Sequence, residues 1–428
     1  MADAVDGQDA RGAQASPPGT VGPTAPGRRE PVLDLLRGIA LLGILLINIE
    51  YMRTSSFYSA FVGEPAASTT ATDAVVQFGM GWLAAGKFLS MFALLFGIGA
   101  AIIAERAVRA GRSPRRLLAR RYGLLVLLGL AHMVLLFPGD ILFLYGLTGL
   151  ALLAFVGVHS RTALRWGVGL VTVMALLFGA LTGLAAFAPE LPEDDPAVAA
   201  QQAFFADLEE QAVSAHTEGS YRDVVVANAI ESALLQSGQL VLLPWVLGLF
   251  LLGFAVGKAG VIGDLAAQRP LLSRVAGWGL GLGLPVNLLL GPVGPLWGGA
   301  TLQQGVENPE LLVVVAVVQL LGAPLLASGY LAGAALLALR FGAPRRLAAV
   351  GRMALSAYLA QSVLALIVFA GFGLYGTLGS AEALAVVVAI WALLLLICPW
   401  WLRRFRYGPV EWLWRSATYG ARQPLRIS

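Results

Sequence analysis

The stretch LDLLRGIALLGILLINIEYM, residues 33–52, decides the fold of this chain. It is long and apolar enough to cross a bilayer as a helix, since about 20 apolar residues span the hydrocarbon core. It also carries Asp34, Arg37 and Asn48. At about 100° per residue, Arg37 and Asn48 lie about 20° apart around the helix, and Asp34 lies about 60° from Arg37. The three residues therefore form one polar stripe along the first span.

This stripe has two interpretations. Asp34 and Arg37 can form a local pair near the helix end, with Arg37 extending to the membrane interface. Alternatively, a stripe that runs roughly 20 Å along the helix indicates a span facing a polar cavity, because charged groups inside a membrane face the bundle interior.

The composition indicates an all-α polytopic membrane protein. Of the 428 residues, 58% are hydrophobic and only 13% are charged, and the mean hydropathy is +0.76. A soluble fold of this length cannot bury so much apolar surface, and long apolar runs recur. We predict about ten spans, near 31–52, 81–105, 122–138, 140–158, 165–188, 238–261, 274–297, 311–338, 350–375 and 382–402.

The distribution of Lys and Arg predicts the orientation. With the N-terminus in the cytoplasm, 25 of the 29 basic residues fall in cytoplasmic segments, as the positive-inside rule requires. Both termini are then expected in the cytoplasm. The basic sequence pI of about 9.4 reflects this topology signal, so we expect a lipid bilayer and no nucleic acid as partner.

The chain divides into five predicted segments. Residues 1–30 are expected to be a disordered tail, because they are rich in Gly, Pro, Ala and Asp. Residues 31–188 and 238–402 hold five spans each, and 403–428 form a cytoplasmic interfacial tail in which Glu411 and Arg415 stand at helical pairing distance. The acidic segment 189–237 should lie outside the cell, as one or two amphipathic helices or as a solvated spacer.

His132 and Asp140 are the strongest candidates for chemistry. They flank the Pro–Gly turn in "HMVLLFPGD", which predicts a helical hairpin that brings them together. Imidazole is a common general base near neutral pH, and an Asp that orients it is frequent in acyl-transfer sites. The alternative is an interhelical hydrogen bond with no chemistry.

Lys87 is a further charge inside a predicted span, with Ser90 on the same face. It is either a cavity-facing cation or an interfacial residue whose amine reaches the headgroups. The sequence has no P-loop, no GxGxxG and no Cys/His cluster with metal spacing, so we expect no metal.

Five motifs together resemble the bacterial YeiB family, whose members carry a C-terminal domain of unknown function. They are "LDLLRGIALLGILLINI", "KFLSMFALLFGIG", "HMVLLFPGDILFLYG", "GRMALSAYLAQSVL" and "GPVEWLWRSATYG". The match covers about residues 30–420. The first third also resembles a wider superfamily of transmembrane acyltransferases, which includes heparan-α-glucosaminide N-acetyltransferase and the polysaccharide O-acyltransferases.

The resemblance implies a multi-pass protein of the bacterial inner (plasma) membrane that takes acyl-CoA from the cytoplasm. Arg37, oriented by Asp34, would bind the donor phosphates together with Lys87, Arg120 and Arg121. In the O-acyltransferases a catalytic His follows the first-span Arg by eleven residues, and here that position is Asn48. Asn48, His132 and Asp140 would then line the outer end.

Three functions remain open at this point. The first is acyl transfer to a small-molecule acceptor or an envelope glycan or lipid. The second is transport or flipping of an anionic or amphipathic small molecule through the same cavity, and the third is a non-catalytic scaffold. The Gly-rich face "GWGLGLGLPVN" permits close packing, either in a homodimer or inside one chain.

Overall fold

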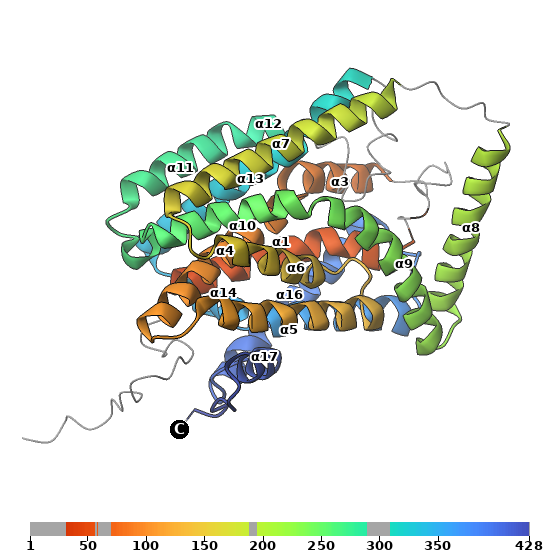
Figure 1. Cartoon of the computed structure of the whole chain (residues 1–428). Helices are drawn as coiled ribbons and strands as arrows, with labels where there is room; N and C mark the ends of the chain where they lie inside the picture. Colours follow the sequence, from red (N-terminus) through yellow and green to blue (C-terminus); the bar gives the residue numbers. More distant parts are fainter. Residues whose placement is uncertain (1–30, 56–57, 59–69, 188–194, 289–308, 428) are drawn as a thin grey trace, which may run out of the picture.

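The fold is taken from a computed structural model of the chain, which describes residues 31–55, 58, 70–187, 195–288 and 309–427 (Figure 1). The predicted tail 1–30 lies outside the described residues. The described part is built from helices, with one isolated β-bridge between Phe405 and Arg426. The first half contains α1 (Pro31–Met52), α3 (Ala71–Leu83), α4 (Lys87–Arg109), α5 (Pro114–Leu135), α6 (Leu142–Ala151), α7 (Ser160–Ala186), α8 (Pro196–Thr217) and α9 (Tyr221–Val241). The second half contains α10 (Leu243–Lys258), α11 (Arg269–Gly281), α12 (Gly283–Leu288), α13 (Pro309–Phe341), α14 (Arg345–Arg352), α15 (Ala354–Leu366), α16 (Ser380–Leu402) and α17 (Pro409–Tyr419).

The prediction of an all-α polytopic membrane protein is confirmed. Within the described residues, eight helical stretches are long and apolar enough to cross a membrane. Two shorter apolar helices, 142–155 and 243–258, accompany them. The described residues thus give eight candidate spans, against about ten predicted, and the set differs from the predicted one.

Two boundaries in the predicted set were wrong. Residues 221–241 form a long apolar helix, which continues through the start of the span predicted at 238–261. Helices α9 and α10 are separated at Leu242. Pro244, in the first turn of α10, has no backbone N–H and so cannot continue the hydrogen bonds of α9. The span predicted at 274–297 is divided into α11 and α12, and residues 289–297 lie outside the described part.

The bundle is layered around α1, α4 and α10. Figure 1 shows α7, α11 and α13 on one side of these helices and α5, α14 and α16 towards the other. The most extensive contact is between α4 and α10, where Gly97 and Gly253 face the partner backbone. A Cβ at Gly97 would lie 2.0 Å from the Phe250 carbonyl oxygen, and one at Gly253 would lie 2.0 Å from that of Leu94. Small residues therefore permit the central helices to pack backbone to backbone.

The α5–α6 hairpin forms as predicted. The Pro–Gly turn separates the end of α5 at Leu135 from the start of α6 at Leu142, and the two helices pack together. The acidic segment 189–237 contains α8 and most of α9. In Figure 1, α8 stands across the end of the bundle at which α5 ends, and α9 packs against α5.

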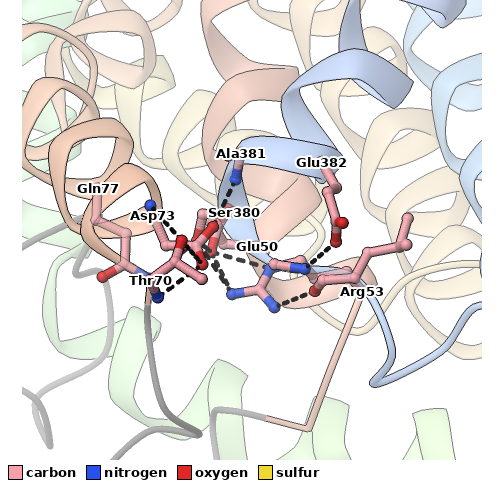
Figure 2. A network of polar contacts seen from close by, with 10 residues as sticks. Glu50, Arg53, Thr70, Asp73, Gln77, Ser380, Ala381 and Glu382 are labelled. Carbon is pink, nitrogen blue, oxygen red and sulfur yellow. Dashed lines mark hydrogen bonds and ion pairs between the residues drawn. The ribbon is translucent and has the colours of Figure 1, made fainter.

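A polar network stabilises the C-terminal end of α1. Arg53 donates to Glu50 at 2.8 Å, to Ser380 at 3.2 Å and to the Leu378 carbonyl at 2.9 Å (Figure 2). The Asp73 carboxylate accepts from the backbone N–H of Ala381 at 2.9 Å. The contacts of Arg53 and Asp73 therefore hold α1, α3 and the start of α16 together.

The C-terminal tail folds back onto the bundle. α17 packs against α5 and α15. The spacing had suggested a pair between Glu411 and Arg415, but the structure shows other partners for Glu411. Its buried carboxylate accepts from the backbone N–H of Leu355 at 2.6 Å and of Ser356 at 3.0 Å, and from the Ser356 hydroxyl. The first N–H groups of a helix have no partner within the helix. Glu411 supplies that partner, and so it docks α17 against the N-terminus of α15.

Candidate functional site

Asp34 and Arg37 form the expected ion pair, with Arg37 Nη1 3.0 Å from Asp34 Oδ1. The Arg37 side chain remains 31% exposed and that of Asp34 16%. Both line the same cavity. The first turns of α1 therefore present the polar stripe to an internal space, as the cavity interpretation expects.

This space, the arginine cavity, has a volume of about 230 Å³. Each of five helices contributes one arginine to its wall: Arg37 from α1, Arg106 from α4, Arg121 from α5, Arg352 from α14 and Arg415 from α17. The acidic groups on the wall are Asp34 and Glu411. Burial raises the pKa of Glu411 above its ordinary value, which further favours a net positive charge in the cavity.

Three of these arginines are held by groups other than carboxylates. Arg121 lies 3.7 Å above the Trp414 ring, and Arg352 donates to the Arg406 carbonyl at 2.8 Å. Arg415 lies 5.1 Å from the centre of the Tyr407 ring. Aromatic and carbonyl partners fix a guanidinium without neutralising it. The three charges therefore stay available to an anion.

The deeper wall of the arginine cavity is apolar. Leu41 and Ile44 continue the line of Asp34 and Arg37 along α1, and Phe92, Phe96 and Ile141 face them. Tyr358 on α15 also lies on this wall. The cavity is thus cationic at one end and hydrophobic at the other, which suits an amphipathic anion.

Two smaller cavities continue along α1. The middle cavity, of about 70 Å³, shares Ile44 and Ile141 with the arginine cavity and is lined by Asn48. The far cavity, of about 20 Å³, shares Tyr51 and Phe137 with the middle one. Because neighbouring cavities share wall residues, the three form a row that follows the α1 stripe.

His132 and Asp140 are joined as the hairpin predicted, with 2.7 Å between His132 Nδ1 and Asp140 Oδ1. The other carboxylate oxygen accepts from the Phe143 N–H at 2.7 Å. The His132 side chain has no exposed surface, and its ring packs 5.0 Å from that of Tyr358. The expectation that His132 and Asp140 line the outer end of the cavity row was wrong, because neither lines any of the three cavities and the ring is enclosed by Phe137 and by Tyr358 of α15.

Ser362 supplies the missing connection. Its Oγ lies 2.9 Å from His132 Nε2, across 230 residues of sequence, and Ser362 lines the far cavity. In the tautomer with its proton on Nδ1, His132 donates to Asp140 Oδ1. Nε2 then accepts from the Ser362 hydroxyl. Asp140, His132 and Ser362 form one directed hydrogen-bond chain.

Two predicted donor-binding residues lie elsewhere. Lys87 is buried at the start of α4 and donates to the Gly81 carbonyl at 2.7 Å, and it does not line the arginine cavity. The break between α3 and α4 turns it towards that carbonyl. Arg120 is exposed and also lies off the cavity wall, although its neighbour Arg121 is on it. Consecutive residues of a helix point about 100° apart, so Arg120 points to the exposed side of α5 while Arg121 faces the cavity.

Comparison with known proteins identifies the family. The chain is 30% identical to YxaH of Bacillus subtilis (strain 168) over 427 residues, covering 94% of this chain and 97% of that protein. It is 31% identical to YeiB of Escherichia coli (strain K12) over 408 residues, covering 92% and 98%. A family profile described as "Protein of unknown function (DUF418)" matches residues 256–421. The chain belongs to the YeiB-like DUF418 family. A further relative, described as a 39.9 kDa protein in the amylase 3′ region of Bacillus acidopullulyticus, is 27% identical over 412 residues, covering 95% and 98%.

The DUF418 region supplies only part of the site of this family member. Arg352, Ser362 and Arg415 fall inside residues 256–421, whereas Arg37 and His132 precede them. Both the arginine cavity and the Asp140–His132–Ser362 chain therefore need the helices that come before the matched region. The site therefore belongs to the whole bundle.

Sequence reasoning missed Ser362 and the full arginine set. Ser362 was hidden in the polar group of "GRMALSAYLAQSVL", where it stands four residues after Tyr358 and so shares its helix face. Arg106, Arg352 and Arg415 were not named as site residues, because nothing in their local sequence distinguishes them from other basic residues near span ends. Their membership of the site becomes visible only when the helices are packed, because it depends on which helix each side chain faces.

Proposed function

We propose that this protein is a membrane-embedded acyltransferase, which binds acyl-CoA in the arginine cavity and passes the acyl group to an acceptor on the other side of the membrane. The observation that carries the proposal is the convergence of five arginines from five helices on one cavity with an apolar interior. The resemblance of the first third of the chain to transmembrane acyltransferases supports it.

The charge of the cavity fits the donor. Coenzyme A carries a pyrophosphate and a 3′-phosphate, which need several cations at close range. Arginine binds phosphate through two parallel N–H bonds and keeps its charge when desolvated. Arg37, Arg121 and Arg352 approach the cavity from three directions and can contact separate phosphate groups. Asp34 keeps the Arg37 guanidinium in place without cancelling the remaining charge.

The apolar interior fits the other end of the donor. From Asp34 to Ile44 the α1 wall changes from charged to aliphatic over ten residues, which is about 15 Å of helix. The pantetheine arm of the donor would lie against Leu41, Ile44 and Phe96, with the thioester pointing towards the next cavities. The middle cavity with Asn48 then continues towards the far end.

The orientation of the bundle agrees with this use. Arg106 and Arg121 flank the arginine-rich loop that the positive-inside rule assigns to the cytoplasm, where acyl-CoA is made. The far cavity would then lie near the outer face of the bacterial inner membrane. Acceptors that reach it are small molecules or envelope glycans and lipids.

The decisive experiment compares two adjacent arginines. Arg121→Ala removes a cavity guanidinium, whereas Arg120→Ala removes an exposed one from the same helical turn. Binding of radiolabelled acetyl-CoA and palmitoyl-CoA to the purified protein in nanodiscs should weaken about tenfold or more for Arg121→Ala, because a hydrogen bond to a charged group contributes roughly 1.5–3 kcal/mol. Arg120→Ala should bind like the wild type. Equal weakening by both variants, or no binding by the wild type, would remove acyl-CoA as the ligand.

Transport or flipping of an amphipathic anion is the second candidate, favoured by the same row of cavities. Release of free coenzyme A thiol separates the two. An acyltransferase releases the thiol with acceptor-dependent kinetics, whereas a transporter moves the labelled compound into vesicles intact. A non-catalytic scaffold would do neither.

A further inference from the structure

Ser362 lies at the junction between the buried hydrogen-bond chain and the far cavity. The chain consists of Asp140 from the α5–α6 turn, His132 from α5 and Ser362 from α15. Distances of 2.7 Å and 2.9 Å join the three side chains. This order of acid, imidazole and hydroxyl is the one that activates a serine for attack on an acyl carbon.

The orientation of each member is fixed. Asp140 Oδ2 is held by the Phe143 N–H, so its Oδ1 must face the imidazole. The His132 ring is enclosed by Tyr358 and Phe137, at centroid distances of 5.0 Å and 6.4 Å. A ring that cannot rotate keeps Nε2 on the serine. Preorganisation of this kind is what a positioned base requires.

Only the serine reaches open space. Asp140 has no exposed surface and lines none of the three cavities, whereas Ser362 lines the far cavity. With its proton directed to Nε2, the Ser362 oxygen keeps lone pairs for a ligand in that cavity. Ser232, another buried serine that packs against α5, bonds instead to the Met133 backbone carbonyl.

The far cavity contains further polar groups. Asn228 is 1% exposed, lines this cavity, and has no hydrogen-bond partner for its Nδ2. A buried donor without a partner is costly, so a ligand atom or a water is expected beside it. Glu231, which is 5% exposed, stands on the same wall.

The size of the far cavity restricts what enters it. Its volume of about 20 Å³ holds about one water-sized group. Only one small terminal group fits at a time, first the carbonyl of the thioester and then the hydroxyl or amine of an acceptor, whereas a whole sugar ring does not. Glu231 can accept a hydrogen bond from such a group, and Asn228 can donate one.

We propose that Ser362 is a nucleophile, which takes the acyl group as an O-acylserine before it passes to a hydroxyl or amine in the far cavity. This inference rests on the proposed function and adds its covalent step. In the first half-reaction, Ser362 Oγ bonds to the thioester carbonyl carbon and its proton moves to His132 Nε2. The carbon–sulfur bond then breaks, and the thiolate takes that proton and leaves as the free thiol.

The second half-reaction reverses the proton movement. The acceptor hydroxyl or amine gives its proton to His132 Nε2 and bonds to the acyl carbon. The bond to Ser362 Oγ breaks, and Oγ recovers the proton. The products are the acylated acceptor and free Ser362, so no oxidant, reductant or metal is required. Asn228 Nδ2 is the donor on this wall that would stabilise the negative carbonyl oxygen.

The test uses the full-length protein in nanodiscs with two probes. A fluorophosphonate carrying a fluorophore reports a reactive serine whatever the donor, and radiolabelled acetyl-CoA, quenched within one turnover, reports the acyl adduct. Both should modify the peptide that contains Ser362, as located by mass spectrometry. Ser362→Ala should lose both adducts, and His132→Ala and Asp140→Asn should slow labelling about a hundredfold or more.

Two further variants separate chemistry from folding. Ser232→Ala removes another buried serine that packs against α5, and it should label like the wild type. Ser362→Cys supplies a nucleophile of similar size, so it should still accumulate an acyl adduct, now as a thioester.

The outcomes distinguish this inference from the function on which it rests. Acyl transfer that persists in Ser362→Ala, with no adduct on Ser362, would overturn the covalent step and leave the acyltransferase proposal intact. A His132-dependent fluorophosphonate adduct without any adduct from acetyl-CoA or palmitoyl-CoA would support the reactive serine and reject acyl-CoA as its donor. Absence of both adducts in wild-type protein would reject the nucleophile.

Discussion

Gly351 of α14 lies directly against the backbone of α1 at Asp34, with so little space that a Cβ on Gly351 would stand 1.7 Å from the Asp34 carbonyl oxygen. This contact fixes the distance between the two helices that carry Arg37 and Arg352. The shape of the arginine cavity therefore depends on a residue without a side chain.

Gly351→Ala should damage the cavity and the fold together. The added methyl group meets backbone, which cannot rotate away, and overpacking typically costs about 1–3 kcal/mol. We expect a lower melting temperature and weaker acyl-CoA binding. Gly99→Ala is the control, because Gly99 lines the same cavity but its Cβ would meet only Arg37 Nη2, at 4.0 Å. A Gly351→Ala protein with wild-type stability would contradict the packing described here.

Arg37 variants should affect binding more than stability. Both members of the Asp34–Arg37 pair are partly exposed, so its loss should cost about 1 kcal/mol or less, rather than the roughly 3–5 kcal/mol of a buried pair. Arg37→Lys keeps the charge but loses the two parallel N–H bonds, and so should bind acyl-CoA more weakly at unchanged melting temperature. Asp34→Asn, which keeps the guanidinium, should bind better than Arg37→Lys. The reverse order would place the ligand away from Arg37.

The docking of α17 should weaken as pH rises. Burial raises the pKa of Glu411 in the docked state, so the protonated form is the one favoured by docking. Its contribution to stability is complete below the pKa of the undocked group and is lost as pH rises through the docked pKa. Limited proteolysis of the tail should therefore be faster at pH 8 than at pH 5.

Glu411→Gln should make this proteolysis independent of pH, because the amide cannot ionise. Glu382→Gln, which alters an exposed carboxylate bond to the Gly379 N–H at the start of α16, is the matched control and should keep the pH dependence. A tail equally protected at both pH values in the wild type would show that Glu411 does not control docking.

The orientation of the bundle can be tested with single cysteines. Cys398 is buried, so a reporter at an exposed position dominates the labelling. Glu210→Cys on α8 should react with a membrane-impermeant maleimide in intact cells. Arg115→Cys at the start of α5 should react only after permeabilisation, because the positive-inside rule places it in the cytoplasm. The opposite pattern would invert the topology.

The sequence by itself determined the membrane class, the helical architecture and the local parts of the site. Hydropathy reports burial in lipid, and both the 3.6-residue period and the Pro–Gly turn act over a few residues. The Asp34–Arg37 pair and the His132–Asp140 contact were accessible for that reason, since one lies within a helical turn and the other within one hairpin.

Only the tertiary structure decided which residues share a cavity. A helical wheel gives the direction of a side chain around its own axis, but the neighbour it meets depends on how helices pack. Packing here depends on close backbone contacts such as those of Gly97 and Gly351, which hydropathy does not encode. Ser362 therefore reaches His132 across 230 residues, while Lys87, within a predicted span, ends on a backbone carbonyl away from the arginine cavity.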